Sequence, residues 1–253
     1  MGQPRSSVIL WEGPSAINGK KIAVIATGLK EGSKNRKTGE RTIQIWVIPG
    51  AEGTARELSE NGKDKAICGS CPLRPVTAKK NGTTVCYVQK QIRISHGAAQ
   101  VVLAYQRGSY ERATKKDIEK ALLKQPLVRW GAWGDPLAIP RYVFERSSIF
   151  RLLLSSVRHT GYTRRWLGLD ADTARWAQKW LMASCHTASE AKLADAAGWR
   201  YFRTRAKNSE LLIGERGCPA SKEMGHKLTC GTCRACDGVS RGASRPSISI
   251  VIH

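Results

Sequence analysis

Seven of the eight cysteines fall into two groups along the 253-residue chain, a pattern typical of metal ligands. The C-terminal group comprises Cys218, Cys230, Cys233 and Cys236, and its last three members form a C-x-x-C-x-x-C run. Three thiolates at steps of three residues can bind three corners of a [4Fe–4S] cluster. A Cys-Pro dipeptide supplies a fourth ligand after the run in bacterial ferredoxins, and Cys218-Pro219 offers one before it. The spacing favours [4Fe–4S] over a four-thiolate Zn²⁺ site, because this group lacks two separated C-x-x-C pairs; free or redox-active thiols are the third interpretation.

The N-terminal group, Cys68, Cys71 and Cys86, has one thiol fewer than a four-ligand site needs. Three thiolates suit a cluster with one iron open to a substrate or cofactor. They also suit zinc completed by a histidine, with His96 as the nearest candidate, and a distant residue could instead complete the site across the fold. The eighth cysteine, Cys185, lies in an apolar stretch, and we expect it to pack as a small buried hydrophobe.

The chain carries 42 lysines and arginines against 20 acidic residues, a formal net charge of +22 at pH 7. Such a charge predicts attraction to polyanions, so nucleic acid is the partner that we expect first, with an acidic host protein as an alternative. No apolar run approaches the roughly 18 residues of a membrane span, and no signal-peptide pattern occurs. We therefore expect no membrane partner and a cytoplasmic location, where clustered cysteines indicate metal or redox sites rather than disulfides.

An α/β fold is expected to position these groups. Residues 1–67 form a β-rich lead-in, in which β-branched runs at 20–28 and 41–50 predict a hairpin. Residues 68–253 form an α/β core that we expect to make one structural domain with the lead-in. Its two cysteine loops span 68–95 and 218–238.

Strands and helices alternate after residue 125. The expected strands occupy 126–135, 158–166, 181–185, 199–205, 210–217 and 247–253. The expected helices occupy 96–107, 115–124, 141–157, 171–181 and 188–198, and Thr114, Asp170 and Thr187 provide N-caps for three of them. This alternation indicates βαβ crossovers and a mainly parallel sheet, either doubly wound or forming a partial or complete β/α barrel.

The carboxyl ends of parallel strands usually carry the ligand site. Polar, aromatic and cationic residues follow the expected strands: Trp133, Asp135, Tyr162, Thr163, Arg164, Cys185, His186, Arg203, Arg205 and Cys218. Arg164, Arg203 and Arg205 are the candidate phosphate ligands. Asp135 is a candidate catalytic residue or ligand, and equally a turn former before Pro136. No P-loop, G-x-G-x-x-G, G-x-S-x-G or H-E-x-x-H motif occurs, which disfavours nucleotide hydrolysis and serine-type hydrolysis.

Between residues 40 and 240 the chain resembles uncharacterised cysteine-rich proteins of bacteriophages and mobile elements. The resemblance rests on ICGSCPLRP…CYV, CPASKEMGHKLTCGTCRACDG, WGAWGDP, TGYTRRW, LMASC and AGWRYFR. Related phage families look similar to radical-SAM barrels, in which three cysteines of a C-x-x-x-C-x-x-C motif hold a cluster whose open iron binds S-adenosylmethionine. Cys68, Cys71 and Cys86 depart from that spacing. The resemblance implies a barrel-like α/β fold and a metallocluster, with S-adenosylmethionine as a candidate ligand.

These observations favour a phage- or plasmid-type iron–sulfur protein that acts on or binds nucleic acid. One alternative is a zinc-stabilised basic nucleic-acid-binding protein without catalysis. Another is a protein that binds a host protein by charge.

Overall fold

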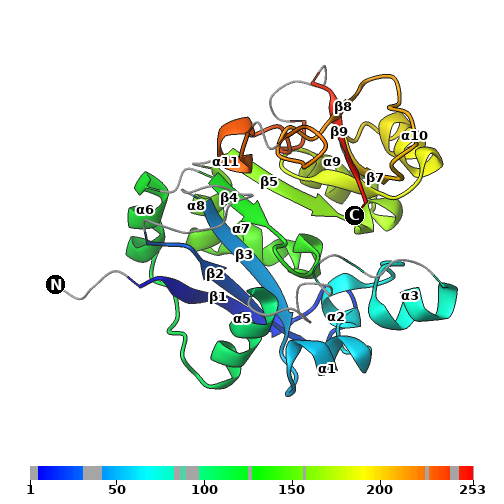
Figure 1. The fold of residues 1–253 in the computed structure, drawn as a ribbon. Helices are drawn as coiled ribbons and strands as arrows, with labels where there is room; N and C mark the ends of the chain where they lie inside the picture. The colour runs from blue at the N-terminus through cyan, green and yellow to red at the C-terminus, as the bar shows by residue number, and fades with distance from the viewer. Residues whose placement is uncertain are drawn as a thin grey trace.

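The computed structural model describes residues 5–30, 42–82, 86, 88, 97–124, 127–155, 158–225, 228–239 and 245–252. Within them lies one nine-stranded sheet of strand order β1-β2-β3-β4-β5-β6-β7-β9-β8 (Figure 1). Its strands are β1 (Ser7–Pro14), β2 (Lys21–Thr27), β3 (Thr42–Pro49), β4 (Leu127–Trp130), β5 (Arg158–Thr163), β6 (Met182–Cys185), β7 (Tyr201–Arg205), β8 (Glu215–Gly217) and β9 (Ser247–Val251). The prediction of a mixed α/β fold is confirmed.

The sheet has an antiparallel part and a parallel part. β1, β2 and β3 pair antiparallel, which confirms the predicted hairpin between β2 and β3. From β3 onward every pair is parallel. All eight residues of β3 are buried, as expected for a strand covered on both faces.

The sheet does not close into a complete barrel within the described residues, since β1 and β8 each pair with only one strand. The outer edge of β1 is already occupied. The amide of Ile9 donates to the carbonyl of Glu111 at 2.9 Å, and the amide of Ala113 donates to the carbonyl of Ile9 at 2.8 Å. The segment around residues 111–113 therefore covers the edge that barrel closure would need.

The helices flank the sheet (Figure 1). They are α1 (Ala55–Glu60), α2 (Lys65–Cys68), α3 (Pro75–Asn81), α5 (Gly97–Gln106), α6 (Lys115–Lys124), α7 (Arg141–Arg146), α8 (Ser148–Ser155), α9 (Ala171–Gln178), α10 (Ala188–Ala196) and α11 (Cys230–Cys233). The predicted N-caps are confirmed at Thr114, Asp170 and Thr187, whose side-chain oxygens accept backbone N–H groups three residues later.

Several element predictions were wrong in extent: the strands expected at 126–135 and 158–166 end at Trp130 and Thr163. The single helix expected at 141–157 is two helices, because Ser147 between them adopts an extended conformation with ψ of 122°. The strand expected at 210–217 is reduced to its last three residues, β8.

An aromatic cluster fixes the parallel part of the sheet to its helices. Trp130 of β4 packs on Phe144 of α7, Phe150 of α8 and Trp180 after α9, with ring centroids 5.1–6.4 Å apart. His159 of β5 belongs to this cluster and accepts a 3.1 Å hydrogen bond from the Trp130 indole. Helices therefore cover the His159 face of β5, and the next residues along the strand alternate between this face and the opposite one.

Candidate metal centres

The N-terminal cysteine group lies at the carboxyl edge of the parallel sheet. Cys68 ends α2, and the amide of Cys71 donates to the carbonyl of Cys68 at 3.1 Å. Cys86 is tied back to this turn through a 2.9 Å hydrogen bond from its amide to the carbonyl of Leu73. The amide of Asp135, in the loop after β4, donates to the carbonyl of Ile67 and holds α2 against the strand ends.

The three thiols are close enough to act on one another electrostatically. Burial raises the pKa of Cys68, and the negative charges of Asp64, Cys71 and Cys86 raise it further. Burial also raises the pKa of Cys71, which a backbone hydrogen bond at Leu73 opposes. Without a cation among them, three thiolates here would repel one another in a site of low polarity.

A buried ion pair shapes the turn that carries Cys68 and Cys71. The guanidinium of Arg74 donates to Asp64 Oδ1 at 2.6 Å, with side chains 9% and 1% exposed. The same guanidinium donates to the carbonyl of Gly62 at 3.0 Å and to that of Gly69 at 3.3 Å. Burial raises the pKa of Asp64 against the lowering effect of Arg74. The two thiols are thus presented by a turn that protein contacts hold without a metal.

Asp135 is buried beside this group, and its carboxylate has one local and two long-range partners. Its carboxylate accepts hydrogen bonds from the amide of Leu137 at 2.9 Å, the hydroxyl of Thr163 at 2.9 Å and the amide of Arg164 at 2.8 Å. Burial raises the pKa of Asp135, and these hydrogen bonds oppose the shift. The bond from Leu137 is that of a turn former, whereas the bonds from Thr163 and Arg164 join the loop after β4 to the loop after β5.

Two of the three candidate phosphate ligands are engaged by carboxylates. Arg164 donates to both carboxylate oxygens of Glu190, one at 2.7 Å, and to the carbonyl of Ser184 at 2.8 Å. Arg203 is 4% exposed and donates to both carboxylate oxygens of Glu215 at 2.6 Å.

The third candidate, Arg205, is half-buried and donates to the carbonyl of Ser209 at 2.6 Å. In this arrangement all three guanidinium groups bind the protein itself, and Arg203 has no exposed donor edge for a phosphate.

The C-terminal cysteine group lies on the face of the sheet opposite the aromatic cluster. The amide of Cys218, directly after β8, donates to the carbonyl of Ser249 at 2.8 Å. Cys230 and Cys233 begin and end the short helix α11. The amide of Gly161 in β5 donates to the carbonyl of Cys236 at 3.3 Å, which lays this segment across the middle of the sheet.

The four thiols of this group also repel one another as thiolates. Burial raises the pKa of Cys236 well above its usual range. The charges of Cys230, Cys218 and Cys233 raise it further, and a hydrogen bond from the hydroxyl of Tyr162 lowers it. Burial, followed by the charges of three of these thiols, raises the pKa of Tyr162.

A buried arginine holds the end of this segment against the sheet. Arg200, 4% exposed, donates to the carboxylate of Asp237 at 3.2 Å and to the carbonyls of Ala235 at 2.7 Å and Gly238 at 2.8 Å. Arg245 donates to both oxygens of Asp237 at 2.8 and 3.0 Å. The loop that carries Cys236 is therefore positioned by ion pairs and hydrogen bonds as well as by anything its thiols bind.

Tyr162, Arg200 and Asp237 are site residues whose roles sequence reasoning missed. Tyr162 was expected at the carboxyl edge, whereas its side chain faces the C-terminal cysteines. The alternation along β5 is the signal that could have found it, because His159 is the packed histidine of the opposite face. No sequence signal links Arg200 to Asp237, which lies 37 residues away on another segment.

All eight cysteines are free thiols. Within the described residues, no three cysteine, histidine, aspartate or glutamate side chains are arranged closely enough to hold a single metal ion. His96, the candidate fourth ligand of the N-terminal group, lies outside the residues that the structure describes. Cys185, buried as expected, belongs to neither group.

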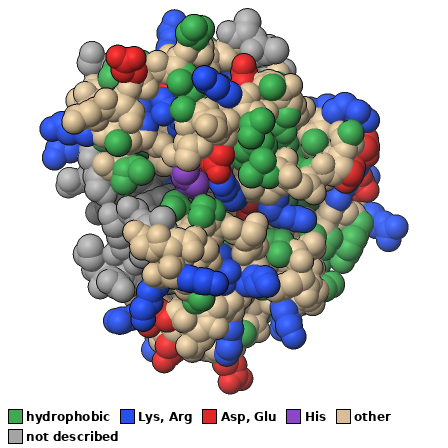
Figure 2. All heavy atoms as spheres, turned by 90° about the vertical axis from the view of Figure 1, so that its right-hand side faces the viewer, with side chains coloured by type: hydrophobic (Ala, Val, Ile, Leu, Met, Phe, Trp, Pro, Cys, Tyr) green, Lys and Arg blue, Asp and Glu red, His purple; other side chains and the backbone are tan. Residues whose placement is uncertain are grey.

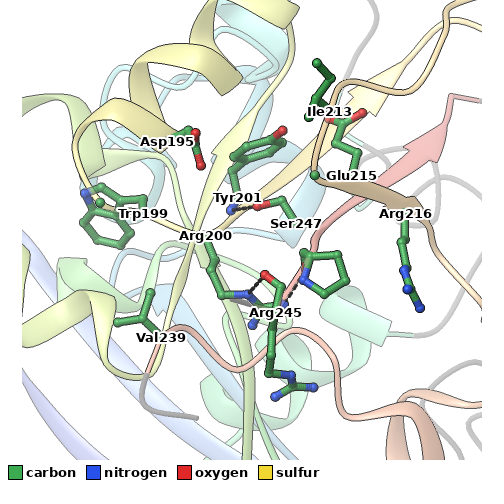
Figure 3. Close-up of a pocket in the computed structure, with 13 residues that line it drawn as sticks. Asp195, Trp199, Arg200, Tyr201, Ile213, Glu215, Arg216, Val239, Arg245 and Ser247 are labelled. Carbon is green, nitrogen blue, oxygen red and sulfur yellow. Dashed lines mark hydrogen bonds between the residues drawn. The ribbon is translucent and has the colours of Figure 1, made fainter. Parts of the chain in front are cut away.

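A hollow of about 480 Å³ lies at the amino ends of β7, β8 and β9, on the edge opposite the N-terminal cysteines (Figure 3). Arg200, Tyr201, Arg216, Arg245 and Ser247 are among its lining residues. Arg200 and Arg245 point toward the segment on both sides of Cys236, where the carboxylate of Asp237 and the carbonyls of Arg234, Ala235 and Gly238 accept their hydrogen bonds. The hollow therefore borders the ion pairs that hold this segment, and none of its described lining residues is a cysteine.

None of the described helices has the length and apolar character that crossing a membrane requires. Comparison with protein-family models, with curated proteins and with solved structures finds no match for this chain. The function of this chain is therefore inferred from the arrangement of the cysteine groups and from the charge of the chain.

Proposed function

We propose that this chain is an iron–sulfur protein that acts on nucleic acid. One cluster would be held by Cys218, Cys230, Cys233 and Cys236. A second metal centre would be held by the N-terminal group. The observation that carries the proposal is that thiols up to 18 positions apart in the chain act electrostatically on Cys68 in one group and on Cys236 in the other, where they raise the pKa of these two thiols, and form no disulfide.

The thiol spacing favours a cluster over a single zinc ion. Zinc draws four sulfurs to about 2.3 Å from one centre, whereas no three described donors are arranged to hold one ion, so a zinc site would require the C-terminal segment to rearrange. A [4Fe–4S] cluster distributes its irons over the corners of a cubane and accepts thiolates that are spaced more widely. The donors of the C-terminal group fit such a cluster in number and chemistry. The zinc-stabilised alternative predicts the same ligands with a different metal.

The N-terminal group is the better candidate for chemistry. It follows β3, the first strand of the parallel part, and lies at the carboxyl ends where ligands bind in parallel α/β folds. We interpret β3 to β9 with their helices as an open, partial β/α barrel. A [4Fe–4S] cluster supplies one-electron transfer, and with three protein thiolates it also leaves one iron position for a substrate atom.

S-adenosylmethionine is the first ligand to test at that position, because the resemblance to radical-SAM barrels implies it. The residues of this chain would hold the cluster through Cys68, Cys71 and Cys86. The Asp64–Arg74 pair would fix the turn, and Asp135 would join that turn to the loops after β4 and β5.

The partner is proposed from charge. The net charge of +22 favours association with phosphate backbones, and Lys and Arg side chains are spread over the face seen in Figure 2, with acidic side chains interspersed among them. Exposed lysines of α2, α3 and the turn before α2 adjoin the N-terminal cysteines in the chain; they are Lys63, Lys65, Lys79 and Lys80. With Arg203 buried, these lysines are better placed than the predicted arginines to meet phosphates near the proposed open iron.

Metal analysis tests the cluster. The full chain purified without oxygen is expected to be brown and to contain iron and acid-labile sulfide, about four of each per occupied group. Cys71→Ser and Cys233→Ser should each remove the metal of one group. Cys185→Ser changes a buried thiol outside both groups and should leave the iron content unchanged. A colourless chain that carries zinc alone would support the zinc-stabilised alternative and contradict the proposal.

Salt titration tests the partner. The double variant Lys79→Ala/Lys80→Ala should weaken binding to a DNA or RNA duplex and reduce the slope of log affinity against log salt by about 1.8, roughly 0.9 for each lost phosphate contact. Lys116→Ala/Lys120→Ala makes the same charge change on α6, on the opposite side of the molecule in Figure 1, and should leave the slope unchanged. Equal effects of the two variants would place the contact elsewhere, and tight binding to one host protein without affinity for nucleic acid would favour the third alternative.

A further inference from the structure

Two hydroxyl groups line the hollow at the amino ends of β7, β8 and β9 and keep hydrogen-bonding capacity that the described residues do not use. Tyr201 is 3% exposed, and its hydroxyl makes no hydrogen bond with any described residue. The oxygen of Ser247 accepts a 3.1 Å hydrogen bond from the amide of Tyr201, but its own proton has no described acceptor. Burial raises the pKa of Tyr201, so its hydroxyl stays protonated at neutral pH and can donate. A buried hydroxyl without a partner costs free energy, which a ligand in the hollow would recover.

Charged side chains of both signs also line the hollow. Arg216 of β8 is exposed and forms no ion pair or hydrogen bond through its side chain with a described residue. The same holds for the exposed carboxylate of Asp195, in the last turn of α10. The side chain of Arg245 is 30% exposed, so part of its guanidinium remains accessible beside its ion pair with Asp237.

These groups are distributed over two sides of the hollow. In the view of Figure 3, Asp195 and Tyr201 lie on one side of it. The guanidinium groups of Arg216 and Arg245 lie on the other side. One side therefore offers a hydroxyl and a carboxylate, and the other offers positive charge.

The rest of the lining includes apolar surface and adds no unpaired charge. Ile213 is fully exposed at the hollow, and Val239 and Pro246 also line it. Glu215, the other acidic residue of the described lining, is neutralised by Arg203 at 2.6 Å. A volume of about 480 Å³ lies in the range of small-molecule sites, which usually combine apolar walls with a few convergent polar groups.

We propose that this hollow binds a small phosphate ester of the size of a mononucleotide. Arg216 and the accessible part of Arg245 bind the phosphate, since guanidinium groups match phosphate oxygens in bidentate geometry. The hydroxyl of Tyr201 and the carboxylate of Asp195 bind the other end of the ligand, where a nucleoside carries hydroxyl and amino groups. This inference goes beyond the proposed function, because it requires neither a metal nor a nucleic-acid strand.

Calorimetric titration of the full chain with each of the ribonucleoside 5′-monophosphates tests the site. The salt concentration is about 150 mM, at which charges more than about 8 Å apart are largely screened. We expect saturable binding of at least one of these nucleotides. Inorganic phosphate and the corresponding nucleoside should each bind more weakly, because each of them contacts only one side of the hollow.

Arg216→Gln should weaken this binding by about 10- to 100-fold, the effect of losing a hydrogen-bonded contact to a charged group. Arg151→Gln is the matched control. It removes the same charge from an exposed position of α8 that does not line the hollow, and it should leave the affinity unchanged.

Tyr201→Phe separates a ligand contact from a structural role. Because the hydroxyl has no described partner, the variant should keep its free energy of unfolding and lose about 2- to 10-fold in affinity for the nucleotide. A loss of stability with unchanged affinity would contradict the ligand contact and overturn the inference.

Three other results would overturn it: no saturable binding of any of the nucleotides, inorganic phosphate that binds as tightly as they do, or equal losses of affinity in Arg216→Gln and Arg151→Gln. None of these results bears on the metal content of the chain, so this inference and the proposed function can fail separately.

Discussion

Arg203 and Glu215 form the most enclosed ion pair described in the structure, with side chains 5% and 0% exposed. Both nitrogens of the fork donate to the carboxylate at 2.6 Å, and one of them also donates to the carbonyl of Glu210 at 3.0 Å. The sequence position of Arg203 at a strand end predicts a phosphate ligand, whereas this geometry predicts a structural role. Replacement of Arg203 by methionine separates the two roles.

The expected loss of stability follows from burial. Arg203→Met leaves the carboxylate of Glu215 buried and without its cation, and breaking a buried pair in this way costs about 3–5 kcal/mol. For a domain of this size the melting temperature falls by roughly 2–4 °C for each kcal/mol, so a loss of about 6–20 °C is expected. The double variant Arg203→Met/Glu215→Gln removes the unpaired buried charge. The side-chain amide oxygen of the new glutamine can still accept the 2.9 Å hydrogen bond from the backbone amide of Leu212. It should recover most of the loss, because an unpaired buried charge is the larger part of the penalty.

Urea denaturation of the two variants and the unmodified chain gives their free energies of unfolding. Binding to a nucleic-acid duplex is then measured over a range of salt concentrations, at a temperature at which all three chains are folded. The structural role predicts a salt slope that does not change in either variant. The reasoning is refuted if Arg203→Met keeps its stability while the slope falls by about 0.9, the signature of one lost phosphate contact.

Two further perturbations probe the site and its surroundings. Gly238 has φ of 62°, and a Cβ there would lie 2.3 Å from the carbonyl oxygen of Gln178. Gly238→Ala should therefore lower the free energy of unfolding by on the order of 4 kcal/mol. It should also release metal from the C-terminal group. Gly225→Ala is the matched control, because Gly225 also has a positive φ, of 70°, but no atom lies within 4 Å of the added Cβ. The left-handed backbone alone should lower its free energy of unfolding by about 1–2 kcal/mol. Equal losses for the two variants in urea denaturation would contradict the steric contact at Gly238. Burial, with the charge of Arg164, lowers the pKa of His186 from 6.5 to about 4. Between pH 6.5 and 4 the unfolded chain therefore binds a proton that the folded chain does not, and stability should fall as the pH falls through this window, with the full contribution present above pH 6.5. His186→Asn should flatten that part of the stability profile, and an unchanged profile would show that His186 titrates normally in the folded chain.

Local signals were sufficient for much of the fold. The caps at Asp170 and Thr187 act within one helical turn, and the runs that form β2 and β3 are adjacent in the chain, so short-range sequence determines both. The grouping of the cysteines was also readable, because the members of each group lie within 18 positions of one another in the chain.

Long-range partners could not be predicted in the same way. Arg203 of β7 forms an ion pair with Glu215 of β8, and β9 lies between these two strands in the sheet. No local sequence pattern predicts this strand order. Strand β1 was missed because a bulge between Ile9 and Trp11 breaks its alternation. Helix α11 was missed because it has only four residues, and Thr232 rather than an acidic residue completes its capping box.

The break between α7 and α8 shows a related limit. The apolar pattern continues through Ser147, so periodicity predicts one helix. The chain breaks there because Phe144 of α7 and Phe150 of α8 both pack on Trp130, with ring planes 81° apart. Tertiary packing decides the geometry that the periodic pattern leaves open.

X-ray absorption at the iron edge of the anaerobically purified full chain tests directly whether the two cysteine groups bind a metal. It needs no variant. The proposal predicts iron with a first shell of sulfur and a second shell of iron neighbours, as the cubane requires. A zinc edge with four sulfur neighbours and no iron, or a chain without bound metal whose thiols all react with an alkylating reagent, would contradict it.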